Sequence, residues 1–410
     1  MQQRSIFRAG VPLAVAALAL SACGSRGDTG TTGGGATAGG ASSAATKTVK
    51  IGVIAPLSGD LSALGLGIQH SVELAVKQAN ASNAVPGWKL EVLAKDDEAK
   101  ADVGKNAATA LAADDAVVGV VGNLNSSVSQ QTQPVFAAAK ITQISPANTN
   151  PTLTKGPDGN KRQYPTYFRT CTTDAVQGPF AAQYLLSQGI KKVATIHDKK
   201  TYGQGLVAAF TTEFKKGGGE VVAAEAINPD ESNYQAVISK VKPSAPQAVY
   251  YGGEYPQAGP LSNQMKGAGL TVPLMGGDGI YDPKYIELAG GGSNKDLATS
   301  VGAPTESTES GKKFLAEYQA AGYKDPAAAY GGYSYDAANA IINALKTSLK
   351  DAKDPKAARD ATTTAVAGVA FAGVTGQVAF DEFGDAKARV LTAYKVDGGK
   401  WVPAKTGEFK

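Results

Sequence analysis

Side chains that commonly carry catalysis or bind metal ions are scarce in this sequence of 410 residues. It has only two cysteines and two histidines, and neither His70 nor His197 stands in a metal-ligand spacing. It has no G-x-S-x-G nucleophile motif and no G-x-x-x-x-G-K-S/T phosphate loop, and the stretch ALGLGIQH lacks the last glycine of the dinucleotide fingerprint. These absences predict a protein that is not an enzyme and that holds no metal ion or cofactor.

Neither sign of charge is in large excess. Lysine and arginine number 40 and aspartate and glutamate 36, which gives a net charge of +4 at pH 7. Because no block of basic residues is interleaved with aromatic side chains, we expect no contact with nucleic acid. No apolar run reaches the roughly 20 residues that a membrane-spanning helix needs.

The first 22 residues are typical of an export signal. Arg4 and Arg8 supply the positive start, and a short apolar run follows over residues 9–20. The sequence then reads Leu-Ser-Ala-Cys up to Cys23, which resembles the bacterial lipobox, where a peptidase cuts before the cysteine and the sulfur receives diacylglycerol. We therefore expect residues 1–22 to be removed and Cys23 to carry a lipid; an ordinary signal peptide with a chance cysteine is the alternative.

Residues 23–47 are rich in Gly, Ser, Thr and Ala and nearly free of large apolar groups. Such a segment buries too little surface to offset the entropy of ordering it, so we expect a flexible tether between the membrane and a folded body. Only Cys171 remains beyond the tether. The body therefore has no internal disulfide and depends on its core for stability.

From about residue 48 onward, apolar strand-like runs alternate with amphipathic helical patterns. After the run KIGVIAP, for example, Ile68, Val72 and Val76 fall on one face of a helix. This alternation predicts parallel sheets with crossover helices. The length exceeds what one core usually covers, so we expect two lobes, with the last helices packing back on the first sheet.

The turns that follow the strands hold the candidate site, because ligands of open α/β sheets bind at the carboxyl ends of the strands. GNLNSS places Asn125 and Ser126 at the start of a helix, where free N–H groups and the helix dipole favour a carboxylate or phosphate. A serine that only caps its own helix is the alternative. In SPANTN, the Thr149 hydroxyl and the Ala147 carbonyl offer the donor and acceptor that an amino acid head group needs.

Three further turns offer an aromatic ring and two negative charges. Asp278 in GGDGI lies between glycines at a strand end, where its carboxylate suits an ammonium group; an Asx turn is the alternative. Tyr202 in KTYGQG is placed either to close over a ligand or to fill the start of a helix. Glu254 in YYGGEYP follows a strand and offers a carboxylate to the same region.

Seven segments in order make the sequence similar to the leucine/isoleucine/valine-type periplasmic binding proteins, the substrate-binding components of branched-chain amino acid ABC transporters. The segments are KIGVIAPLSGDLSALG, GNLNSS, ISPANTNPTLT, FRTCTTDAVQGP, IHDKKTYGQGL, YYGGEYPQAG and LMGGDGI. The resemblance implies the type I fold, in which two doubly wound, Rossmann-like α/β lobes are joined by three crossover strands. The expected parts are lobe I, residues 48–172 and 302–387, and lobe II, residues 173–301 and 388–410.

The resemblance also implies a role for each turn. It implies that Ser126, Ala147 and Thr149 hold the α-carboxylate and α-amino groups of the ligand. Tyr202 then covers the ligand, and Asp278 pairs with its ammonium group.

Three positions that concern the ligand side chain depart from the family pattern. Leu64 and Glu254 stand where the leucine-binding relatives carry tyrosines, and Asn125 stands where they carry a cysteine, so the family disulfide is also absent. Burying Glu254 without a partner is costly. Either the ligand carries a donor there, as a basic or amide-bearing amino acid does, or Glu254 pairs within the protein, the candidates being Lys199, Lys200 and the Tyr255 hydroxyl.

These observations predict a monomeric lipoprotein on the extracytoplasmic face of the cell membrane. We expect it to bind an amino acid, of the branched-chain type or a polar or cationic relative, and to deliver it to an ABC transporter permease and its ATPase. A hinge is expected near residues 172, 301 and 388. A sensor for amino acids or small amides such as urea is the alternative; a small-amide hydrolase is less favoured, because no nucleophile with a base is present.

Overall fold

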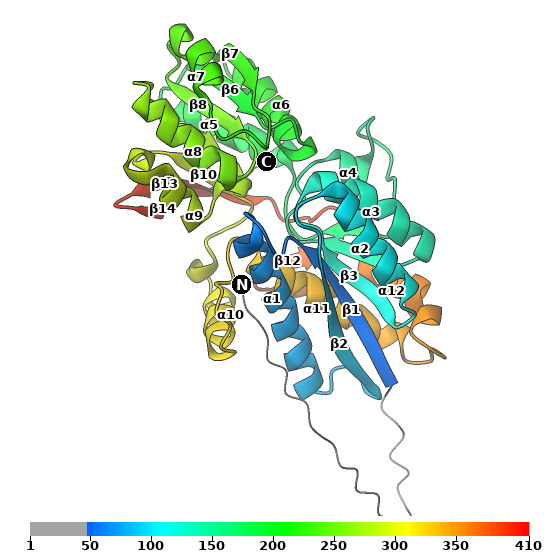
Figure 1. Cartoon of the computed structure of the whole chain (residues 1–410). Coiled ribbons are helices and arrows are strands. Elements are labelled where there is room, and N and C mark those ends of the chain that lie inside the picture. Colours follow the sequence, from blue (N-terminus) through cyan, green and yellow to red (C-terminus); the bar gives the residue numbers. More distant parts are fainter. Residues whose placement is uncertain (1–46, 410) are drawn as a thin grey trace, which may run out of the picture. The chain divides into compact units, whose positions relative to one another are not determined.

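The computed structural model describes residues 47–409 (Figure 1). Every described residue belongs to one compact unit, Ala45–Lys410. The expected export signal, Cys23 and nearly all of the expected tether lie outside the described residues. No helix between residues 47 and 409 is both long and apolar enough to cross a membrane.

Lobe I is built on a parallel sheet of five strands in the order β2-β1-β3-β4-β5. Strand β3 is buried along its whole length, as expected for a strand covered by helices on both faces. The strands are β1 (Lys47–Ala55), β2 (Trp88–Asp96), β3 (Val117–Gly122), β4 (Thr142–Ser145) and β5 (Tyr167–Arg169).

Helices cover both faces of this sheet, because side chains of alternate strand residues point to opposite sides. Ile51 and Val53 of β1 join the apolar cluster that contains α1 and α11, whereas Ile54 joins the cluster that contains α2 and α3. α11 and α12 both contact β3 and β4. The helices and the small hairpin of this lobe are α1 (Ser62–Ala81), α2 (Ala101–Ala113), α3 (Ser126–Ala139), α4 (Thr152–Lys155), η4 (Thr305–Ser307), α10 (Glu309–Ala320), α11 (Gly331–Ser348), η5 (Lys356–Ala358), α12 (Arg359–Ala367), β11 (Ala370–Gly373) and β12 (Gly376–Ala379).

Lobe II is built on a sheet of seven strands in the order β14-β13-β10-β9-β8-β6-β7. Five of them are parallel, but β13 pairs antiparallel with β10 and β14 pairs antiparallel with β13. The alternating sequence pattern predicted the parallel part and not this antiparallel edge. The strands are β6 (Lys192–His197), β7 (Glu220–Ala226), β8 (Ala248–Gly252), β9 (Leu274–Gly276), β10 (Leu297–Ser300), β13 (Val390–Asp397) and β14 (Lys400–Glu408).

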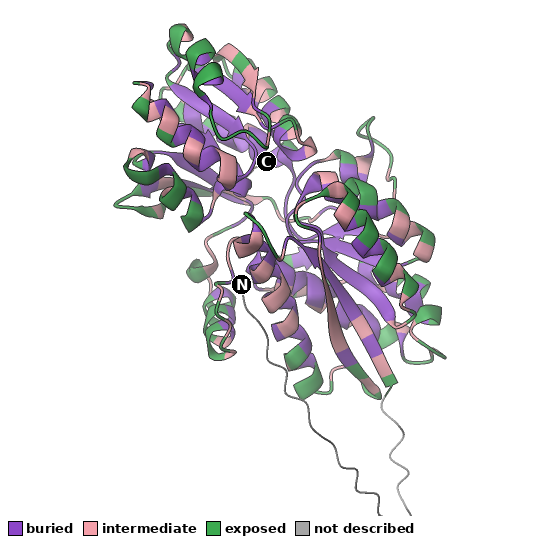
Figure 2. Cartoon of the chain, in the orientation of Figure 1, coloured by how far each residue is buried: buried purple, intermediate pink, exposed green. Residues whose placement is uncertain are grey.

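An aromatic core lies under the helices of lobe II. The rings of Phe210 and Tyr250 stack with their centroids 3.7 Å apart, and Phe214 stacks next to Phe210. Figure 2 shows the central strands of both sheets as buried and the outward faces of the helices as exposed, and the edge strands β2, β7 and β14 are only partly buried or exposed. The helices are α5 (Asp174–Ser187), α6 (Thr201–Lys216), α7 (Gln235–Val241), η1 (Lys242–Ser244), α8 (Tyr255–Gly267), η2 (Asp278–Ile280), α9 (Pro283–Ala289) and η3 (Gly290–Ser293).

The chain passes between the two sheets three times. The first connection, residues 170–173, joins β5 to α5, and the second, residues 301–304, joins β10 to η4. The third, residues 380–389, joins β12 to β13. Each lobe is therefore made of segments that are distant in the sequence.

Candidate functional site

A small cavity of about 10 Å³ lies between the lobes, among turns that follow strands of both sheets. Thr149 is buried two residues from the cavity wall. The other seven residues predicted to contact a ligand line this cavity, together with three that were not predicted. The lining residues are Leu64, Leu124, Asn125, Ser126, Ala147, Tyr202, Glu254, Asp278, Gly279 and Tyr330.

The start of α3 contributes Asn125 and Ser126 to the cavity wall. Asn125 occupies the cap position and makes no side-chain cap bond to its own helix. Ser126 is the first helical residue and is almost fully buried. Since the first N–H groups of a helix have no partner within it, this end of a 14-residue helix favours an anionic group.

Asp278 lies in a buried pocket of neutral donors on the other side of the cavity. The hydroxyl groups of Tyr202 and Tyr330 each donate to its carboxylate at 2.8 Å, and the Gln177 amide donates at 2.9 Å. Burial raises the pKa of Asp278, and these hydrogen bonds partly offset that rise. A negative group held only by neutral donors is suited to an ammonium ion.

A second carboxyl group, Asp174, lies behind Asp278 at the start of α5. It is completely buried, and one of its oxygens has no hydrogen-bond partner among the described residues. Burial and the nearby Asp278 raise the pKa of Asp174 to about 8. At neutral pH the pair therefore favours one negative charge rather than two, because both groups resist ionisation in the same dry region.

Glu254 lies on the cavity wall and also has partners within the protein. Its carboxylate accepts from Asn125 Nδ2 at 2.8 Å and from Lys200 Nζ at 3.0 Å, and only 3% of the residue is exposed. Burial lowers the pKa of Lys200, but Glu254 and Asp198 together raise it by more. Of the three protein partners considered from the sequence, Lys200 is the one that pairs with Glu254. The Lys199 ammonium bonds Asn228 instead, and the Tyr255 hydroxyl donates to the Asp60 carbonyl.

Residues 48–400 match the model of the family described as periplasmic binding protein. The chain belongs to this family. It is 31% identical over 352 residues to Leu/Ile/Val-binding protein homolog 1 of Brucella suis, across 86% of this chain and 91% of that protein. The solved structure of the leucine-binding protein LivK of Thermotoga maritima has a TM-score of 0.78 at 26% identity and covers 87% of this chain and 98% of its own. LivJ of Streptococcus pneumoniae, solved in complex with isoleucine, has a TM-score of 0.78 at 27% identity, with coverages of 88% and 100%.

These likenesses confirm the type I fold that the sequence predicted for this periplasmic binding protein. They also confirm the resemblance to the branched-chain amino acid type. The relatives are solute-binding proteins and not enzymes, and members of the family work outside the cytoplasm.

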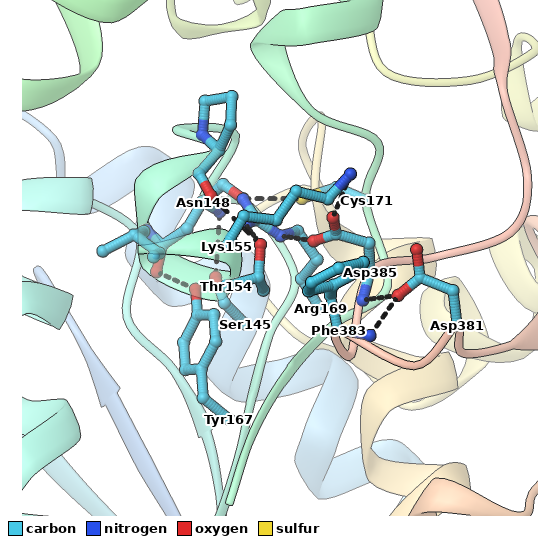
Figure 3. Close-up of polar contacts among 12 residues, drawn as sticks. Ser145, Asn148, Thr154, Lys155, Tyr167, Arg169, Cys171, Asp381, Phe383 and Asp385 are labelled. Carbon is cyan, nitrogen blue, oxygen red and sulfur yellow. Dashed lines mark hydrogen bonds and ion pairs between the residues drawn. The ribbon is translucent and has the colours of Figure 1, made fainter. Parts of the chain in front are cut away.

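A buried guanidinium group of the periplasmic binding protein, that of Arg169, bonds Asn148 in the turn over residues 147–149 (Figure 3). Arg169, at the end of β5, is fully buried, and its Nη1 donates to the carbonyls of Asn148 and Asn150 at 2.7 and 3.0 Å. Its Nε lies 2.7 Å from Asp385 Oδ1 in the third connection. Arg169 thus holds both carbonyl groups that flank Thr149 and fixes the shape of this turn.

The only cysteine of the described residues, Cys171, belongs to the same network. Its side chain is completely buried, and Sγ donates to the Asn148 carbonyl at 3.3 Å. Burial raises the pKa of the thiol far above its usual range. In the native state this thiol is therefore both covered and un-ionised.

Tyr330 is the main site residue of this binding protein that the sequence did not reveal. It directly precedes α11, in the segment AAAYGG, which the sequence pattern marks only as part of a helix. Leu124 and Gly279 were also missed, although each adjoins a predicted residue. No local pattern could identify Tyr330, because it meets Asp278 only through the approach of the two lobes.

Proposed function

We propose that this periplasmic binding protein binds an amino acid in the cavity between its lobes and delivers it to an ABC transporter. One observation carries the proposal: the start of α3 and the buried Asp278 line the same small cavity from opposite lobes. An amino acid carries a carboxylate and an ammonium group a short distance apart, and this pair of groups complements that arrangement.

Each residue of the site has a role in this proposal. Ser126, with Ala147 and Thr149, holds the α-carboxylate and α-amino groups, Asp278 pairs with the ammonium ion, and Tyr202 covers the ligand. Leu64 and Leu124 supply the apolar part of the wall that the ligand side chain meets. The relatives named for leucine, isoleucine and valine binding support an amino acid as the ligand.

Binding is coupled to closure of the lobes in this proposal. Hydrogen bonds that join the lobes in the structure, such as Asn125 to Glu254, Tyr330 to Asp278 and Thr201 to Gln130, belong to a closed arrangement. The three connections act as the hinge, and ligand contacts made only in the closed form shift the population towards it. A lipid on Cys23 anchors the protein to the extracytoplasmic face of the membrane, where the closed form docks on a permease.

A panel of the 20 amino acids in a thermal-shift assay tests the proposal. We expect at least one L-amino acid to raise the melting temperature, because a ligand present at 100 times its Kd stabilises the native state by about 2.7 kcal/mol. The matching keto acid, which lacks the ammonium group, and the matching amine, which lacks the carboxylate, serve as controls and should give little shift. If no L-amino acid shifts the melting temperature, the proposed function is wrong.

Small-angle X-ray scattering tests the closure. The radius of gyration is expected to fall when the ligand with the largest thermal shift is added at saturation, because the open form then loses its population. An amino acid that gives no thermal shift is the control. An unchanged radius of gyration with the binding ligand would contradict the hinge.

A further inference from the structure

The side-chain amide of Asn125 has an unpaired acceptor at the cavity wall. The residue is 3% exposed, and its Oδ1 has no hydrogen-bond partner among the described residues. It makes no cap bond to α3 either, although a cap position is where an asparagine oxygen normally finds a donor. A buried polar atom without a partner is unfavourable, so it points to a donor that arrives with the ligand.

The orientation of this amide is set by its neighbour. An ionised carboxylate only accepts hydrogen bonds, so Asn125 must present Nδ2 to Glu254 Oε1, which leaves Oδ1 for the other direction. Lys200 holds the second carboxylate oxygen of Glu254 at 3.0 Å. Asn125 therefore cannot rotate its amide without placing two acceptors against each other.

The same contacts argue against a cationic ligand side chain. Glu254 already has an ammonium partner in Lys200 and an amide partner in Asn125, so its charge is balanced within the protein. Burial and Glu254 raise the pKa of the adjacent Asp198 to about 8, so this second carboxyl group adds little negative charge at neutral pH. A purely aliphatic side chain, in turn, would leave Asn125 Oδ1 unpaired in a closed site.

We propose that the site selects an amino acid whose side chain carries an uncharged hydrogen-bond donor, a hydroxyl or a carboxamide, and that Asn125 Oδ1 is the acceptor that recognises it. This inference rests on the proposed function, since it places the head group at Ser126 and Asp278. It names the class of ligand side chain that the proposed function leaves open. Asn125 is then the residue that determines specificity.

Two pairs of amino acids with matched shapes test the inference. Asparagine and leucine have the same branching, and threonine and valine differ only in a hydroxyl against a methyl group. By isothermal titration calorimetry, we expect asparagine, threonine or both to bind the wild-type protein at least about tenfold more tightly than the aliphatic partner, because an unpaired buried acceptor is penalised. Lysine and arginine should bind more weakly than the preferred polar ligand.

The variant Asn125→Leu should remove this preference. The ratio of the two dissociation constants in each pair is expected to fall to about one or to reverse, while the head-group interactions remain. Gln130→Met is the matched control: it also removes an amide that joins the lobes, through Thr201 at 3.0 Å, but Gln130 does not line the cavity. It should leave the ratios unchanged.

The outcomes separate the two proposals. If leucine and valine both bind the wild-type protein as tightly as their polar counterparts, the selectivity inference is wrong while the proposed function stands; this comparison needs no variant to fold. If Asn125→Leu weakens every amino acid by the same factor, so that the ratio in each pair stays as in the wild-type protein, Asn125 Oδ1 does not set the preference and the inference is again overturned. If no amino acid binds at all, the proposed function fails and the inference fails with it.

Discussion

The variant Asp385→Ala is expected to lower the free energy of unfolding by about 3–5 kcal/mol, because it leaves a buried charge without its partner. Arg169 is fully buried, and its Nε lies 2.7 Å from the Asp385 carboxylate. Its Nη1 donates to the carbonyls of Asn148 and Asn150, and its Nη2 donates to the Thr154 hydroxyl. None of these neutral acceptors compensates for a missing countercharge.

Urea denaturation followed by circular dichroism measures this loss. Asp360→Ala is the matched control, because Asp360 also pairs with a cation, Lys140, but both side chains are about two-thirds exposed. An exposed pair contributes roughly 0–1 kcal/mol, so this variant should remain close to wild type. Equal losses for the two variants would show that the Arg169–Asp385 pair does not stabilise the fold.

The variant Asp278→Asn is expected to weaken binding of the best amino acid by about 2–5 kcal/mol, the usual cost of removing one partner of a buried charge pair. That corresponds to a dissociation constant roughly 30-fold to several thousandfold higher. Asparagine has nearly the same shape as aspartate and can still accept hydrogen bonds from Tyr202 or Tyr330. The change therefore removes mainly the charge that faces the ligand ammonium group.

Calorimetric titration with the strongest ligand of the panel measures the effect. The variant Asp230→Asn changes the net charge by the same amount in a separate, more open pocket, at a residue that does not line the cavity, and should alter the affinity by about twofold at most. Wild-type affinity in Asp278→Asn would place the ammonium group elsewhere.

Much of the fold is readable from the sequence because its strands are short apolar runs and its helices have one apolar face. The strand β3 and the helix α1 show these two patterns. The strand β14 does not: most of KWVPAKTGE is exposed, so it has no apolar alternation that would mark it. It is a strand because it pairs with β13, and the local sequence pattern does not predict such a pairing.

The candidate site was predictable to the extent that it follows strand ends. Asn125, Glu254 and Asp278 all lie two or three residues beyond the end of a strand, so the rule for open α/β sheets finds them. Tyr330 lies outside that rule. No sequence pattern singled out Asp174, and only the structure shows that it is fully buried beside a second carboxyl group.

The buried thiol of Cys171 gives this protein a built-in reporter. A buried, un-ionised thiol reacts with alkylating reagents only when local unfolding exposes it to solvent. The labelling rate therefore measures how often the chain around Cys171 unfolds locally. Cys171 lies in the first connection and bonds the same Asn148 carbonyl that Arg169 holds. The labelling rate therefore reports local unfolding of both the first connection and the turn that contains Thr149. Mass spectrometry, by locating the label on the peptide that contains Cys171, would follow this exchange in the full chain without any engineered probe.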